Sequence, residues 1–313
     1  MSTRTTVVIA TYNRSQTYLP ATIESVRRQE SVPRLLVVDD CSPDDTIGYL
    51  SNQPDLDYFS TPGRSERAVT RNLGLAAVES EFVLFLDDDD LLRPGAVRLL
   101  EATLDRFPGV AAAIGGWWTT ADSLPGPYPL NASRTTSASL WREVLLGWNP
   151  ATAGQMLFRT SALRDVGGFP TQYPGIDDFV LLLNLAYRSE IAVVPEIVLD
   201  YRIHSAQQKQ ADQTWDGTAR REFVTAARAA DREEAATLLA ARADFLRAMQ
   251  SRDAEGRAAL RRFVRVAPWA VRSPVIGMPV VRLLGSALGE VVLPRRAMTA
   301  LRARYGHSGK SAT

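Results

Sequence analysis

The sequence contains one cysteine and two histidines among 313 residues. A single cysteine, Cys41, forms no disulfide within the chain, which fits a reducing compartment. The net charge is only +1, which argues against a nucleic-acid-binding protein. No uninterrupted apolar run reaches the roughly 18 residues of a membrane-spanning helix, and residues 1–14 lack the pattern of a signal peptide. We therefore expect a cytoplasmic protein, with at most peripheral contact at the inner face of a membrane.

The sequence has the composition of a soluble globular protein, with 45% apolar and 23% charged residues. Short apolar runs alternate with segments of helical periodicity, which predicts an α/β fold with a mostly parallel sheet covered on both faces. The predicted strands are 6–11, 34–39, 56–60, 82–86, 110–118, 155–159, 191–194 and 198–202. The predicted helices are 17–29, 43–50 with Ser42 as N-cap, 65–78, 94–107, 138–146 and 177–188, with helix-favouring composition over 212–250.

Polar residues follow three of the predicted strands, at residues 11–14, at Asp39 and Asp40, and at residues 87–90. In parallel sheets ligands bind at the carboxyl ends of the strands, so we expect these clusters to share one edge. The four adjacent aspartates at 87–90 repel one another, and a divalent cation such as Mg²⁺ or Mn²⁺ relieves that repulsion. The alternative is a solvated acidic turn at the start of the helix near Pro94.

Three further features are candidates for chemistry. Arg67 and Arg71 are four residues apart, hence on one helix face, and can bind phosphate; the alternative is a pair of surface arginines. Asp177 and Asp178 open an apolar helix, where a carboxylate can act as a general base; the alternative is an N-cap pair. His204 follows a predicted strand and can complete a metal shell, although a lone histidine is usually structural.

Six segments, in order and spacing, resemble the motifs of family 2 glycosyltransferases. They are residues 6–14 (TVVIATYNR), 36–45 (LVVDDCSPDD), 71–75 (RNLGL), 81–90 (EFVLFLDDDD), 155–169 (QMLFRTSALRDVGGF) and 177–186 (DDFVLLLNLA). The resemblance covers about residues 5–205. It implies a GT-A fold, which is Rossmann-like with helices flanking a mostly parallel sheet, a nucleotide-diphosphate sugar donor, and a metal-dependent reaction that inverts the anomeric centre.

The resemblance also assigns roles by position. Tyr12 resembles the residue that stacks on the nucleobase and Asp40 the aspartate that reads it. Asp178 falls at the catalytic base, with Asp177 in support. Asp89 resembles the metal ligand of the DxD motif, and His204 a histidine that joins the metal or the diphosphate in some members. The residues expected to bind the donor nucleotide are Thr11, Tyr12, Arg14, Asp39, Asp40, Arg71, Asp87 and Asp88.

The sequence departs from the family pattern at two positions. Cys41 stands where the family usually has glycine, which puts the local turn in question. Asp177 replaces the glutamate of a Glu-Asp pair, so the base could shift by one residue between Asp177 and Asp178.

These features predict two parts of the chain. Residues 1–210 form the GT-A domain, with a nucleotide-binding half at about 1–115 and an acceptor half at about 116–210; residues 211–313 form a helical extension. Residues 251–313 carry twelve basic and three acidic residues, a net charge of +9. That segment either contacts a membrane surface or packs on the catalytic domain.

The predicted activity is transfer of a sugar from a UDP-, dTDP- or GDP-sugar to a hydroxyl of a glycan or lipid-linked saccharide, in cell-surface polysaccharide synthesis. One alternative is a non-catalytic module that binds nucleotide-sugars or glycans. Another is a sugar-nucleotide nucleotidyltransferase, although that enzyme would want a glycine-rich phosphate loop and residues 11–14 contain no glycine. Four aromatic residues are candidates for stacking on sugar rings, with core packing as the alternative role: Trp117, Trp118, Trp148 and Tyr173.

Overall fold

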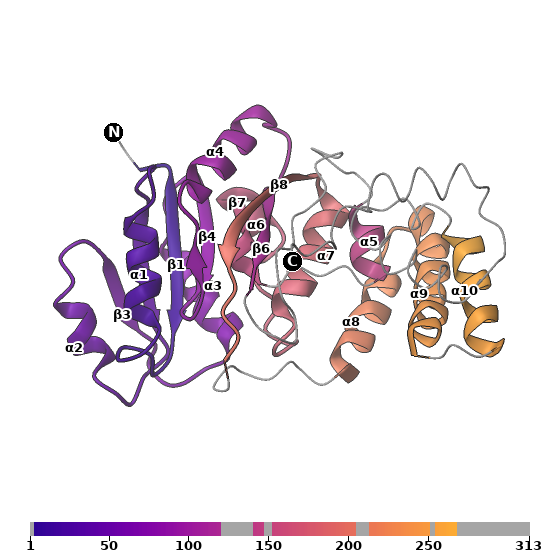
Figure 1. Ribbon diagram of the computed structural model, residues 1–313, viewed down its shortest axis with the longest axis horizontal. Helices are drawn as coiled ribbons and strands as arrows, with labels where there is room; N and C mark the ends of the chain where they lie inside the picture. The colour runs from indigo at the N-terminus through magenta and orange to yellow at the C-terminus, as the bar shows by residue number, and fades with distance from the viewer. Residues whose placement is uncertain (1–2, 120–139, 147–151, 205–212, 251–253, 268–313) are drawn as a thin grey trace, which may run out of the picture. The chain divides into compact units, whose positions relative to one another are not determined.

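The computed structural model describes residues 3–119, 140–146, 152–204, 213–250 and 254–267 (Figure 1). Two features singled out in the sequence lie outside these residues. They are Trp148 and most of the basic segment 251–313.

The N-terminal part forms a parallel β/α arrangement, as predicted. Its elements are β1 (Thr5–Thr11), α1 (Leu19–Arg27), β2 (Arg34–Asp39), α2 (Thr46–Ser51), β3 (Asp57–Ser60), α3 (Arg67–Ala77) and β4 (Phe82–Asp87). The four strands pair in the order β3-β2-β1-β4, all parallel. In this register Thr11 pairs with Asp39, and Ala10 with Asp87. The polar residues that follow the three strands therefore reach the same edge of the sheet.

Within the described residues, the following part completes a mixed sheet of eight strands. Its elements are β5 (Leu91–Leu92), α4 (Ala96–Arg106), β6 (Ala112–Trp118), α5 (Leu140–Leu146), the 3₁₀ turn η1 (Ala153–Gln155), β7 (Met156–Arg159), α6 (Thr160–Asp165), α7 (Asp177–Arg188) and β8 (Ile191–Asp200). The full order is β3-β2-β1-β4-β7-β6-β8-β5. Strand β7 is antiparallel to both of its neighbours, whereas β6 and β8 are parallel.

The core explains why the strands are continuously apolar. Val7 and Ile9 of β1 face a cluster that includes Leu19 and Ile23 of α1, while Val8 points to the opposite face because side chains alternate along a strand. Helix α3 approaches that opposite face at Gly74, where a Cβ atom would lie 2.5 Å from Cγ1 of Val8. Glycine at this position is what lets the helix pack so close to the sheet.

Two predictions about local structure were wrong. The helix expected at 43–50 begins at Thr46, because Asp44 accepts hydrogen bonds from the Thr46 amide and hydroxyl and Ser42 is not its N-cap. The two strands expected at 191–194 and 198–202 form one strand, β8, which passes Pro195 where its pairing with β6 shifts register.

The chain divides into two compact units. Among the described residues, the first unit continues to Leu239 and the second begins at Ala240. Helix α8 (Gln213–Ala226) lies in the first unit, α9 (Ala229–Gln250) crosses the division, and α10 (Ala254–Val266) lies in the second. Within the described helices, none has the length and apolar content needed to span a bilayer. The functional boundary near residue 210 stays a prediction.

Candidate active site

Hydrogen bonds join the ends of the neighbouring strands β2, β1 and β4. Thr11 donates its hydroxyl to Oδ2 of Asp88 at 2.7 Å, and the Tyr12 amide donates to the same oxygen at 3.2 Å. The Asp40 amide donates to the Thr11 carbonyl at 2.8 Å. Residues from β1, β2 and the turn after β4 therefore form one continuous polar edge.

The two aspartates after β2 organise the loops around them. Asp39 is buried and accepts hydrogen bonds from the Ser42 amide and the Ser60 hydroxyl. Asp40 uses Oδ1 to accept from the amide and the hydroxyl of Ser65, at 2.9 and 2.7 Å, and from the Thr61 hydroxyl at 3.2 Å. Asp40 is thereby held at the edge of the sheet, next to the residues that follow β1.

Cys41, the first departure from the family pattern, adopts the left-handed conformation that glycine favours. Its φ is +57°, and Asn13 in the neighbouring turn also has a φ of +57°. Ser42 ties the two turns together by accepting a hydrogen bond from the Asn13 amide at 2.8 Å. The turn geometry of a glycine is thus kept at Cys41, at some cost in backbone strain.

The aromatic residue Tyr12 is half-buried beneath an arginine. The guanidinium carbon of Arg64 lies 4.2 Å from the centre of the Tyr12 ring, a cation–π contact. The Arg14 guanidinium lies 5.3 Å over the ring of Tyr18, and its charge acts on Asp88 and Asp89. Segment 11–14 therefore brings an aromatic ring and a cation to the edge that carries the aspartates.

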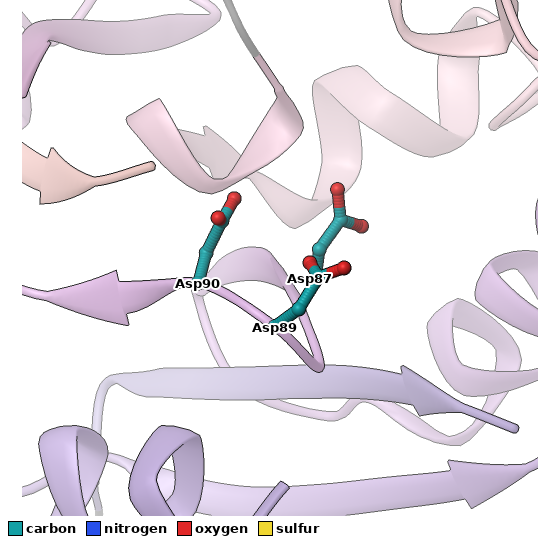
Figure 2. Close-up of side chains that lie close together, drawn as sticks. All are labelled: Asp87, Asp89 and Asp90. Atoms are coloured by element: carbon teal, nitrogen blue, oxygen red, sulfur yellow. The ribbon is translucent and has the colours of Figure 1, made fainter. Parts of the chain in front are cut away.

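The aspartates after β4 form a compact cluster (Figure 2). One oxygen from each of Asp87, Asp89 and Asp90 lies within 4.8 Å of the others. Burial, then the charge of Asp89, raises the pKa of Asp88 to about 7. Burial and neighbouring carboxylates also raise the pKa of Asp89, and that of Asp90 more strongly. Such a cluster is disfavoured in its charged form unless a cation compensates it.

His204 lies next to Asp89 of this cluster. Its Nε2 is 3.0 Å from Oδ2 of Asp89, and its ring stacks on Tyr18 with centroids 4.2 Å apart and planes at 18°. At this cluster two buried atoms, Nδ1 of His204 and Oδ2 of Asp90, have no hydrogen-bond partner among the described residues. Carboxylate oxygens and an imidazole are a donor set that fits Mg²⁺ or Mn²⁺.

Arg202 and Tyr18 complete this corner of the site, and sequence reasoning missed both. The Arg202 amide donates to Oδ1 of Asp90 at 3.0 Å, and its side chain donates to the Asp89 carbonyl and to the Thr22 hydroxyl. Arg202 therefore fixes the turn that carries the aspartates. Both Arg202 and His204 contact the ring of Tyr18, at 5.2 and 4.2 Å.

Arg71 connects the aspartate cluster to helix α7. It is 1% exposed and donates from Nη1 to Oδ2 of Asp177 at 2.7 Å and from Nη2 to Oδ1 of Asp87. Arg67 donates to the other oxygen of Asp177 at 3.1 Å. Burial acts to raise the pKa of Asp87, but the charges of Arg71 and Arg67 outweigh it and hold that pKa below its ordinary value.

The neighbouring aspartates on α7 have different environments. Asp177 is paired with both arginines, whereas Asp178 accepts a hydrogen bond from the Phe179 amide at 2.7 Å. Burial, and next the charge of Asp177, raises the pKa of Asp178 to about 6, even though Arg67 and Arg71 act in the opposite direction. A buried carboxylate with a raised pKa has the properties of a general base.

The aromatic residues considered for sugar stacking have varied surroundings. Tyr173 is buried and donates its hydroxyl to Glu222 of α8. Trp117 packs edge-on against Tyr201, and Trp118 lies beneath the Arg93 guanidinium at 5.4 Å. Core packing is therefore the observed role of Tyr173, while both tryptophans are half-buried.

Comparison with known proteins supports the sequence motifs. A family model described as "Glycosyl transferase family 2" matches residues 6–167. The succinoglycan biosynthesis protein ExoO of Rhizobium meliloti is 38% identical over 117 residues, which cover 35% of this chain and 31% of that protein. The GalNAc(5)-diNAcBac-PP-undecaprenol β-1,3-glucosyltransferase of Campylobacter jejuni is 38% identical over 100 residues, 30% of this chain and 32% of that protein. The chain thus spans about a third of the length of these curated relatives.

The fold is also that of solved structures. TarS residues 1–349 of Staphylococcus aureus, crystallised with UDP-GlcNAc, superpose with a TM-score of 0.64 at 18% identity, covering 97% of this chain and 92% of that one. The predicted GT-A fold is therefore confirmed.

Proposed function

Because this chain belongs to glycosyl transferase family 2, we propose that it transfers a sugar from a nucleoside-diphosphate donor to a hydroxyl acceptor, with inversion at the anomeric carbon. One observation carries the proposal. Asp87, Asp89 and Asp90 form a carboxylate cluster of the kind that can hold a metal ion. Arg71 links this cluster to helix α7, which bears Asp178, by hydrogen bonds to Asp87 and Asp177. The proposed site for the leaving diphosphate and the proposed base are thus linked through Arg71.

The donor nucleotide would bind along the edge formed by β1, β2 and β4. We assign the nucleobase to Tyr12 and Asp40, and the ribose and diphosphate to residues on either side. Supporting this, Thr11 and Tyr12 hold Asp88, and Arg14 acts electrostatically on the aspartates. The residues assigned to the nucleotide are Thr11, Tyr12, Arg14, Asp39, Asp40, Arg71, Asp87 and Asp88. Arg71 is enclosed between Asp87 and Asp177, so its effect on nucleotide binding would be exerted through these two carboxylates.

We assign a divalent cation, Mg²⁺ or Mn²⁺, to Asp89 and His204, with Asp87 and Asp90 within reach of the same position. When bound, such a cation stabilises the negative charge that develops on the leaving diphosphate. Two features support the fit. The unpartnered buried atoms of Asp90 and His204, among the residues described, supply lone pairs, and burial, followed by the charge of neighbouring carboxylates, raises the pKa values of Asp88 and Asp89.

Asp178 would serve as the base. Its carboxylate accepts the proton of the acceptor hydroxyl while that oxygen bonds to the anomeric carbon, and the bond to the diphosphate breaks on the opposite face. A pKa of about 6 leaves the group mostly ionised at pH 7 and still basic enough to take a proton. Asp177 supports this role because Arg67 and Arg71 neutralise it.

The named relatives suggest the biological class of the reaction. ExoO acts in succinoglycan biosynthesis, and the Campylobacter jejuni protein is an undecaprenol-linked glucosyltransferase by name. We propose a saccharide or lipid-linked saccharide acceptor in cell-surface polysaccharide synthesis and a hexosyl donor carried by UDP, dTDP or GDP.

Calorimetric titration of the protein with UDP, dTDP and GDP, with and without Mn²⁺, tests the proposal. We expect one nucleotide to bind only when Mn²⁺ is present, and the melting temperature to rise, since about 2.7 kcal/mol is gained at one hundred times the Kd. Asp89→Asn should abolish the Mn²⁺ dependence, while Arg98→Gln, on the exposed face of α4, is the matched control. Binding of none of the three nucleotides would contradict the assignment.

A second assay separates the alternatives. Incubation with the corresponding labelled nucleotide-sugar should release nucleoside diphosphate and label an acceptor glycan. Binding without any turnover or donor hydrolysis would instead support a non-catalytic module, and release of pyrophosphate from a nucleoside triphosphate would support a nucleotidyltransferase.

A further inference from the structure

Helix α8 lies beyond the segment matched by the family model and beyond the predicted end of the catalytic domain. It nevertheless belongs to the same compact unit as the sheet and the site. Its residues contact the elements on either side of Asp178, and these contacts involve the buried side chains of Arg220 and Tyr173. Such contacts are costly to bury unless each group is satisfied, so they restrict the local geometry strongly.

Arg220 of α8 contacts α5 and the start of α7. It is 2% exposed and donates from Nη1 to the Val144 carbonyl at 2.6 Å and to the Leu145 carbonyl. Its guanidinium carbon lies 4.3 Å over the ring of Phe179. The backbone amide of Phe179 is the donor that holds Oδ1 of Asp178 at 2.7 Å. The buried Arg220 thus packs against Phe179, whose backbone amide orients the Asp178 carboxylate.

Glu222 of α8 holds the turn that precedes α7. It accepts a hydrogen bond from the hydroxyl of Tyr173, which is 5% exposed and lies four residues before Asp177. Burial, and next the hydrogen bond to Glu222, raises the pKa of Tyr173 to about 12, so this hydroxyl keeps its proton and remains a donor. The turn closes with a hydrogen bond from the Ile176 amide to the Tyr173 carbonyl at 3.2 Å.

Aromatic packing joins the same elements further along. Phe223 of α8 meets the ring of Tyr187 of α7 edge-on, with centroids 5.1 Å apart, and lies 6.0 Å from Trp141 of α5. Helix α8 therefore contacts α7 at Phe179, near the start of α7, and at Tyr187, near its end.

We propose that α8 is a positioning element for the base, in which Arg220 acts through Phe179 and Glu222 acts through Tyr173 to hold Asp178. The inference rests on the proposed function, because Asp178 is the base there. Arg220 and Glu222 are positioning residues; neither needs to touch the substrate. A base that must align with an acceptor hydroxyl is sensitive to small displacements, since about 1 Å of misplacement can cost about a hundredfold in rate.

Steady-state kinetics on single variants test the proposal. Tyr173→Phe removes one oxygen, and Arg220→Met removes the charge while keeping much of the volume. Both should lower kcat about tenfold or more and leave the KM for the donor within about twofold, because the chemical step and not donor binding depends on Asp178. Glu222→Gln keeps an oxygen acceptor for Tyr173 and should retain near-normal kcat. Arg221→Met, the exposed neighbour on α8, is the matched control and should be unaffected.

Hydrogen exchange provides a readout that does not require activity. In Tyr173→Phe and Arg220→Met we expect faster amide exchange over residues 173–181, with the exchange of β1 and β4 unchanged. Folded variants with normal kcat and normal exchange over 173–181 would overturn the proposal. If the wild-type protein transferred no sugar, the proposed function would fail, and exchange over 173–181 would still decide whether α8 holds this segment.

Discussion

At the scale of single residues, two adjacent aspartates lie in different electrostatic environments. Asp177 and Asp178 are consecutive carboxylates at the start of α7, yet one is neutralised by two arginines and the other has its pKa raised to about 6. The difference arises because the helix turns by about 100° per residue, so neighbours face different surroundings. The site can therefore hold a structural carboxylate and a basic one side by side.

The raised pKa of Asp178 predicts a pH dependence. A base acts in its ionised form, so kcat/KM for transfer should rise as the pH increases through about 6 and then level off. Asp178→Asn should lower kcat by about 10² to 10⁴-fold with little change in nucleotide affinity. Initial-rate measurements between pH 5 and 8 at saturating Mn²⁺, together with nucleotide titrations, check both expectations. An unchanged kcat in the variant would exclude Asp178 as the base.

Cys41 offers a second prediction at this scale. Its φ of +57° is unfavourable for any residue with a Cβ and more so for a β-branched one. Cys41→Gly should raise the free energy of unfolding by up to about 1 kcal/mol, because relieved strain outweighs the added freedom of the unfolded chain. Cys41→Val should lower it by about 1–2 kcal/mol.

Urea denaturation gives these values, with Cys41→Ser as the control that changes the thiol but leaves the backbone demand unchanged. Equal stability of the glycine and valine variants would show that the turn is not strained.

At the scale of elements, Arg71 joins three of them: α3, on which it lies, β4 through Asp87, and α7 through Asp177. Replacing this arginine removes the ion pair of Asp87 and leaves the buried Asp177 with Arg67 alone. We expect Arg71→Ala to lower the free energy of unfolding by about 3–5 kcal/mol, the usual cost of breaking a buried ion pair.

The control for this experiment is Arg98→Ala, because Arg98 pairs with Glu30 on the surface with a side chain that is 68% exposed. Its loss should cost no more than about 1 kcal/mol. Urea unfolding followed by tryptophan fluorescence measures both. Similar losses for the two variants would mean that Arg71 does not hold the elements together.

At the scale of the whole molecule, charge is unevenly distributed. The net charge is +1 although residues 251–313 carry +9. In the second compact unit, α10 buries Leu260 and Phe263 and exposes Arg261 and Arg265, which lie four residues apart on one face. Arg262 is paired with Asp244 at 2.6 Å. A basic face of this kind is suited to an anionic surface.

We therefore expect the full chain to bind vesicles that contain phosphatidylserine and to bind neutral vesicles poorly, with affinity that falls as salt is raised. Replacing Arg261 and Arg265 by glutamine should weaken binding about thirtyfold, at about 1 kcal/mol per arginine. The matched control replaces Arg28 and Arg98, two exposed arginines of the first unit. Vesicle sedimentation measures the effect, and equal losses in the two double variants would refute a role for α10.

Much of the fold could be predicted from the sequence because local patterns determine it. The apolar runs of β1, β2 and β4 and the spacing of Leu19, Ile23 and Val26 on α1 gave the strands, the helix and its buried face. The strand ends at Thr11, Asp39 and Asp87 predicted where polar groups would gather, since parallel strands place their carboxyl ends together. Two local predictions were wrong. At the start of α2 the side chain of Asp44 competes with helix formation, and β8 continues past Pro195 as one strand.

The amino-acid sequence by itself determined the α/β architecture, the family and the residue types assembled at one edge of the sheet, because periodicity and motif order are local properties. Only the tertiary structure decided which carboxylates are neutralised and which have raised pKa values. It also decided that Arg202 and Tyr18 surround the aspartate turn and that α8 contacts the helix of Asp178. Those outcomes depend on burial and on charges more than a hundred residues apart in sequence, such as Arg71 and Asp177, which approach one another only in the folded chain.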